Sequence, residues 1–225
     1  IAPGVEFQIF FRSAVYVSGD TYDVQQLDDH HIGFFVAAAV RHGAPAALMT
    51  MIINRAIRMK TVLGDRYTIH EPCEVLQGLN RELIRHHSES PRFASAVYAV
   101  MDTRDRTITL AGAGHPAPLI IGPNGTPEPV ETDGSLLGVF SDDDFTQTTF
   151  ALEDDQMLVI YSDGFETAFP EQHSDCYARR LPNRRYVQRF VDLADAWRER
   201  DITTALTSFT DDVNAQTGSL HQLDD

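Results

Sequence analysis

Three aspartates of this 225-residue chain stand where carboxylates could bind a divalent cation. Asp20 follows a glycine at a break between two extended segments, Asp163 lies between an apolar stretch and Gly164, and Asp224 follows Leu223 close to the last residue. Short carboxylates in loops suit hard cations such as Mg²⁺ and Mn²⁺, and such sites need no cysteine or histidine. Aspartate and glycine at strand ends are equally typical of simple turns, so their spacing alone leaves both interpretations open.

The charge and composition of the chain exclude several classes of partner. There are 18 basic and 33 acidic residues, a formal net charge of −15, which disfavours binding to nucleic acids and to anionic membranes. No apolar run approaches the ~20 residues of a membrane-spanning helix. The two cysteines, Cys73 and Cys176, form no CxxC motif, so we expect reduced thiols and a cytoplasmic location.

Hydrophobic periodicity predicts the elements that must position these aspartates. Alternating apolar residues predict a strand over 5–16, and an apolar run predicts a doubly buried strand over 32–38. Apolar stripes at helical spacing predict helices over about 44–60, 71–88, 186–197 and 201–214, the last capped by Asp201. Further strands are expected over 93–101, 107–110, 118–121, 147–152 and 157–161. The order of strands, two helices, strands and then helices favours an α+β fold in which helices flank two antiparallel sheets.

Seven short segments resemble, in the right order, the motifs of PPM-type serine/threonine phosphatases of the SpoIIE/RsbU branch. Residues 19–24 resemble the GDxYD element, 37–48 resemble GDVSGHGxPAAL, and 159–168 resemble LLYTDGLTEA. The others match LxxLNxxL, AGHPPPL, LGV and QxDD, and they lie at 76–83, 113–119, 137–139 and 222–225. Each motif is weak alone, but together they cover nearly the whole chain.

The resemblance implies a β-sandwich of two antiparallel sheets flanked by helices. It also implies hydrolysis of phosphoserine or phosphothreonine by water activated on two Mn²⁺ or Mg²⁺ ions. Matched position by position, the implied metal ligands are Asp20, Asp163, Asp224 and the backbone carbonyl of Ala39.

Three residues near these motifs have two possible roles. His42 and Gly43, ahead of the first helix, are candidates for substrate binding, and His42 and His115 could contact phosphate or metal. A histidine before glycine or proline in such a loop more commonly packs and hydrogen-bonds to its surroundings, and the sequence leaves this open.

Ala38 departs from the family pattern, because the aspartate that bridges the two metals in the family falls on this position. Alanine supplies no oxygen ligand, so we expect weakened metal binding and an impaired enzyme. The persistence of the other aspartates favours a recent or engineered replacement, whereas Arg41 in place of a motif glycine favours a natural pseudophosphatase that only binds.

The expected protein is a single phosphatase domain over 1–225, part of a longer multidomain protein. The resemblance implies a phosphorylated STAS-type anti-sigma-factor antagonist as substrate, and an attached sensory domain that acts through the helices at 44–60 and 71–88. The sequence leaves open a homodimer, a non-catalytic binding module, and a metal-free sandwich that binds a cyclic nucleotide or sugar.

Overall fold

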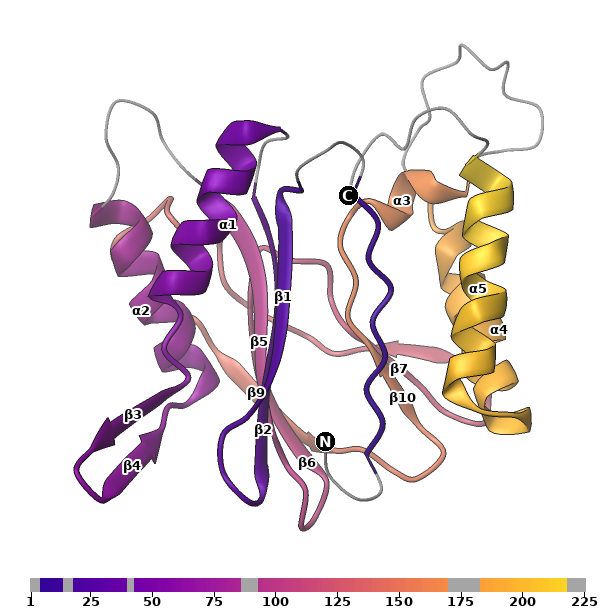
Figure 1. The fold of residues 1–225 in the computed structure, drawn as a ribbon, viewed down its shortest axis with the longest axis horizontal. Coiled ribbons are helices and arrows are strands. Elements are labelled where there is room, and N and C mark those ends of the chain that lie inside the picture. Colours follow the sequence, from indigo (N-terminus) through magenta and orange to yellow (C-terminus); the bar gives the residue numbers. More distant parts are fainter. Residues whose placement is uncertain (1–4, 14–17, 40–42, 86–92, 170–182, 218–225) are drawn as a thin grey trace.

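The computed structural model describes residues 5–13, 18–39, 43–85, 93–169 and 183–217 of the chain (Figure 1). Two antiparallel sheets face each other, and helices cover the outer side of each. This arrangement confirms the expected α+β sandwich.

The larger sheet has five strands in the order β1-β2-β5-β6-β9, and all neighbouring pairs are antiparallel. Its strands are Asp20–Gln26 (β1), His31–Ala39 (β2), Ala94–Asp102 (β5), Thr107–Ala113 (β6) and Gln147–Ala151 (β9). The central strands β2 and β5 are buried along most of their length, as their near-continuous apolar sequences require. Successive residues of β2 point to opposite faces, so Phe34 packs between the two sheets and Phe35 packs under the helices.

The smaller sheet has three strands in the order β10-β7-β8. They are Leu119–Ile121 (β7), Pro127–Pro129 (β8) and Met157–Val159 (β10). The expected turn at residues 123–125 connects β7 to β8, with Gly125 at φ 68°.

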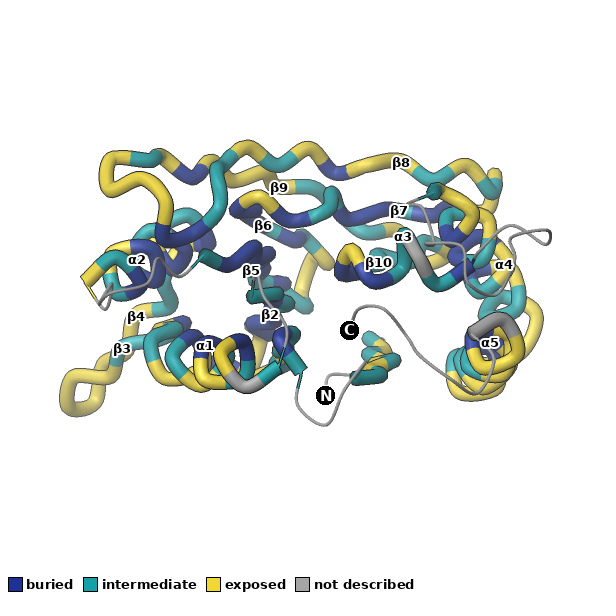
Figure 2. Tube along the Cα trace, turned by 90° about the horizontal axis from the view of Figure 1, so that it is seen from above, coloured by how far each residue is buried: buried dark blue, intermediate teal, exposed yellow. Residues whose placement is uncertain are grey.

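Helices cover the outer faces of both sheets, as the view from above shows (Figure 2). Helices α1 (Ala44–Ala56) and α2 (Pro72–Arg85) pack on the larger sheet through a core that includes Ile53, Leu76 and Leu79. Helices α3 (Phe165–Ala168), α4 (Arg185–Glu199) and α5 (Ile202–Thr217) pack on the smaller sheet. A third apolar cluster lies between the two sheets, so the molecule has four layers.

Two regions differ from the sequence prediction. The helix expected to reach residue 60 ends at Ala56, and a hairpin of Lys60–Leu63 (β3) and Arg66–Ile69 (β4) follows, turning at Gly64 with φ 61°. The strand expected over 5–16 is not formed by the described residues 5–13. That segment instead places Phe7 against Phe34 of the larger sheet and Phe10 against Phe209 of α5.

The helix α5 begins at a side-chain cap that the sequence predicted. Asp201 caps α5 as expected, because its Oδ1 accepts the Thr204 N–H at 2.8 Å.

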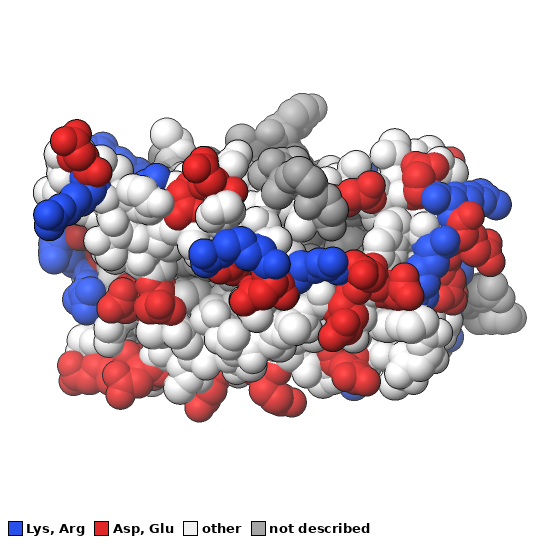
Figure 3. Space-filling model, turned by 90° about the horizontal axis from the view of Figure 1, so that it is seen from below, with Lys and Arg blue, Asp and Glu red and all other residues white. Residues whose placement is uncertain are grey.

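Seen from below, the Lys and Arg side chains of the described residues are interspersed among Asp and Glu, and this face shows no broad basic area (Figure 3). Within the described ranges, none of the helices has the length and apolar content needed to cross a bilayer.

Candidate metal centre

Two residues of the predicted site, Asp20 and Ala38, lie in a row of three residues across the larger sheet. Asp20 of β1 pairs with Ala38 of β2, and Ala38 pairs with Ser95 of β5. Residues directly opposite one another in antiparallel strands place their side chains on the same face. Since Ala38 is four residues from Phe34, this face is the one turned toward the smaller sheet.

Asp163 follows the last strand of the smaller sheet and lies in the turn that joins β10 to α3. The Asp163 carbonyl accepts the Glu166 N–H at 2.9 Å, which starts the short helix α3. Asp163 is exposed by surface area, yet the protein atoms around its carboxyl group, together with the nearby Glu166 carboxylate, raise its pKa. Such an acid gains from a cation beside it, because the cation offsets both effects.

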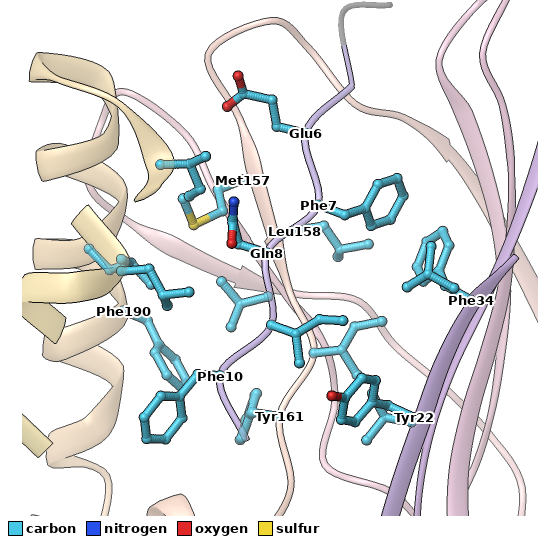
Figure 4. Close-up of a pocket in the computed structure, with 18 of the residues that line it drawn as sticks. Glu6, Phe7, Gln8, Phe10, Tyr22, Phe34, Met157, Leu158, Tyr161 and Phe190 are labelled. Carbon is cyan, nitrogen blue, oxygen red and sulfur yellow. The ribbon is translucent and has the colours of Figure 1, made fainter. Parts of the chain in front are cut away.

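The start of β1, the end of β2 and the turn after β10 all lie at the same edge of the sandwich, the upper edge in Figure 1. A cavity of about 770 Å³ extends between the sheets below this edge, and both Asp20 and Ser162 line it. The other walls of the cavity are mainly apolar. The segment 5–13 contributes Phe7 and Phe10 to the lining, and the two sheets and the residues after β10 contribute Phe34, Leu158 and Tyr161 (Figure 4). Walls of this kind offer few partners for the phosphate or hydroxyl groups of a nucleotide or sugar.

The donor set at this edge is suited to a hard divalent cation but incomplete for a bridged pair. Asp20 and Asp163 supply carboxylate oxygens, and Ala39 closes β2 with its N–H bonded to the Gly19 carbonyl at 2.9 Å. Ala38 presents only a methyl group toward the other sheet. Among the described residues, no three His, Cys, Asp or Glu side chains gather closely enough to hold a metal ion.

Three further residues from the sequence prediction have different outcomes. Asp224 and His42 lie outside the described residues. Gly43 precedes α1 with φ 77°, a backbone conformation that favours glycine, and its carbonyl accepts the Ala47 N–H.

His115 is buried, with 7% of its surface exposed, and its Nδ1 lies 2.9 Å from the Ser95 hydroxyl. Its Nε2 makes no hydrogen bond, and burial lowers the pKa of the ring to about 4, so the imidazole is neutral at pH 7. Sequence reasoning missed Ser95, because one hydroxyl within an apolar strand carries no signal until its partner is known.

Two antiparallel sheets that face each other, with helices on both outer faces, form the α+β sandwich seen in phosphatases of the PPM (PP2C) type. The sequence model for Stage II sporulation protein E (SpoIIE) matches residues 28–225, and the chain belongs to this family.

Curated relatives and solved structures agree with this assignment. The chain is 26% identical to phosphoserine phosphatase RsbP of Bacillus subtilis (strain 168) over 71% of its length, and 32% identical to phosphoserine phosphatase RsbU of the same organism over 67%. It spans 39% of RsbP and 43% of RsbU, less than half of either protein. The SiaA-PP2C domain of Pseudomonas aeruginosa has the same fold, with TM-score 0.69 and 22% identity over 92% of this chain and 78% of that domain. RsbX, solved in complex with magnesium, matches with TM-score 0.60 and 14% identity over 90% and 82% of the two chains.

Proposed function

We propose that this domain is built for metal-dependent hydrolysis of phosphoserine or phosphothreonine on a protein substrate. The observation that carries the proposal is the cross-strand row of Asp20, Ala38 and Ser95, which faces the smaller sheet, after whose strand β10 Asp163 follows. The phosphoserine phosphatases RsbU and RsbP, as relatives, support the reaction class, and the magnesium complex of RsbX supports the choice of metal.

Each residue has a distinct part in this proposal. Asp20, Asp163, Asp224 and the Ala39 carbonyl would hold Mn²⁺ or Mg²⁺, and His42 and Gly43 would contact the substrate. Bound metal would supply an activated water and neutralise phosphoryl charge. The chain itself orients these ligands through strand pairing at residues 19–20 and 38–39 and through the α3 turn after Asp163.

Ala38 limits this activity in the present sequence. A carboxylate at this position would lie directly across from Asp20, between the two sheets, where it could bridge two cations. Without it, cations of like charge would repel one another with no anion between them, so we infer weak binding of the second ion and slow hydrolysis.

The finer parts of the proposal follow from the family. We infer that residues 1–225 form one domain of a longer cytoplasmic protein and act on a phosphorylated STAS-type antagonist in a partner-switching pathway. An attached sensory domain would act through α1 and α2, the two helices that cover the larger sheet.

Restoring the acid tests the enzymatic proposal. The Ala38→Asp variant is expected to release phosphate from a phosphoserine protein substrate in Mn²⁺ at least tenfold faster than the parent, and calorimetry should show tighter Mn²⁺ binding. Ala38→Asn is the matched control, because it adds similar volume without a negative charge. Equal, negligible hydrolysis by the Asp and Asn variants would contradict the proposal.

The alternative function is a binding module that retains a phosphoprotein without hydrolysing it, and the alanine at residue 38 favours it. If this alternative holds, the parent chain should bind the phosphorylated substrate, and the Ala38→Asp variant should release no phosphate from it. Loss of binding after dephosphorylation of the substrate would show that the phosphate is recognised.

A further inference from the structure

We propose that His115 is a positioning residue that holds the two halves of the metal edge in register, one half on each sheet. This inference rests on the proposed function, because it concerns the same edge. It assigns a role to a buried polar pair, His115 and Ser95, that the ligand set leaves unexplained.

The first contact joins His115 to the larger sheet. Its Nδ1 lies 2.9 Å from Ser95 Oγ, and Ser95 is the cross-strand neighbour of Ala38, itself the neighbour of Asp20. The hydroxyl therefore lies on the face that carries residues 20 and 38. A hydrogen bond to the Ser95 hydroxyl restrains the start of β5, where the row of Asp20, Ala38 and Ser95 is formed.

The second contact brings His115 close to the segment that follows β10 of the smaller sheet. The imidazole ring lies close to the main chain of Tyr161, although Nε2 makes no hydrogen bond of normal geometry. Burial lowers the pKa of His115, and the nearby Tyr161 main chain partly opposes that lowering. Tyr161 and Ser162 are buried and directly precede Asp163. The imidazole thus lies between the Ser95 end of β5 and the turn that carries the second carboxylate.

The backbone before His115 fixes this placement. Gly114 has φ 59°, and its N–H donates to the Gly134 carbonyl at 2.9 Å. A Cβ atom at residue 114 would lie 2.7 Å from the Leu136 side chain, so only glycine fits this turn. The turn directs His115 inward from the end of β6, and the buried ring has little freedom to leave.

The test compares amide hydrogen exchange in metal-free protein. His115→Ala is expected to accelerate exchange at least tenfold in two separate segments, residues 94–96 and residues 161–165. His115→Asn keeps a polar group near the Nδ1 position, so it should preserve protection at 94–96 and lose it only at 161–165. Asn80→Ala is the control for general destabilisation: Asn80 is also buried, but it bonds to the Gly138 N–H and the Phe140 carbonyl, next to the Leu137–Ala94 pair of the larger sheet. It should therefore leave exchange at 161–165 unchanged, whatever it does at 94–96.

Metal affinity gives a second readout in the Ala38→Asp background. Adding His115→Ala should weaken Mn²⁺ binding, followed by electron paramagnetic resonance, by about tenfold, the lower end of the effect of residues that orient metal ligands. Adding Asn80→Ala should leave Mn²⁺ affinity unchanged.

Each outcome decides the proposal. Unchanged exchange at 161–165 in His115→Ala, or the same acceleration at 161–165 in Asn80→Ala, would reduce His115 to ordinary core packing and overturn the inference. If Ala38→Asp binds no Mn²⁺ at all, the proposed function fails, yet the exchange pattern still decides whether His115 joins the two sheets. Where His115→Ala does not fold, the exchange pattern of His115→Asn decides the question.

Discussion

Acidification should destabilise this domain through the buried imidazole of His115. The buried ring has a pKa of about 4 against an ordinary 6.5, and burial is the main cause. The unfolded chain therefore binds a proton between these two values that the folded chain does not, and stability falls as pH falls through this window. The stability that comes from the neutral buried imidazole is fully present above pH 6.5 and is lost progressively down to pH 4.

The magnitude follows from the two pKa values. Linkage gives a loss of about 2 kcal/mol in the free energy of unfolding between pH 7 and pH 5, and of about 3 kcal/mol by pH 4. Losses of this size are a large fraction of the stability of a typical domain, about 5–15 kcal/mol.

Other groups titrate with different signs or in a different range. The hydrogen bonds of Asp28 to His30, His31 and Tyr67 hold its pKa well below its usual range, and Arg104 lowers the pKa of Asp102 to about 2. These two carboxylates stabilise the fold above pH 3.8, and their contribution is lost only below that value. Asp163 has a raised pKa, so its contribution grows as pH falls and partly masks the effect of His115.

A difference measurement removes these background terms. Urea unfolding of the parent and of His115→Asn would be followed by circular dichroism at pH 7, 6 and 5. The parent should lose about 2 kcal/mol more than the variant over this range. Parallel pH profiles of the two proteins would refute the argument, because they would mean that the ring is protonated as readily in the folded as in the unfolded chain.

Three substitutions test the packing of helix α2 and of the turn at Gly134. Gly78→Ala should raise stability by about 0.5–1 kcal/mol in urea unfolding, since the nearest atom to the added Cβ in helix α2 lies 4.0 Å away. Gly134→Ala should instead lower the midpoint of thermal unfolding by several degrees, because its Cβ would lie 2.5 Å from the Gly112 carbonyl oxygen; an unchanged midpoint would show that the turn yields freely. Asn80→Ala should cost about 1–3 kcal/mol in chemical denaturation, as it leaves the buried Gly138 N–H without its acceptor at 2.7 Å. A loss below 0.5 kcal/mol would indicate that water replaces the side chain.

Local sequence signals were sufficient for much of the fold. The apolar stripe of α2 and the Asp201 cap of α5 depend on neighbours within one or two helical turns, and both were predicted. The continuous apolar run of β2 predicted its burial on both faces. The hairpin of β3 and β4 was missed, although the Gly64-Asp65 pair between short β-prone segments is a turn signal.

The sequence by itself determined which side-chain oxygens the candidate site can contain, and that the side chain of residue 38 contributes none, because the side chain of each residue fixes its own chemistry. Only the tertiary structure decided that Ala38 lies between Asp20 and Ser95, and that Ser95 meets His115. Strand register is set by pairing between segments far apart in the chain, and a shift of one residue would turn the whole row to the opposite face. No local pattern fixes that choice; the packing of both faces of the sheet does.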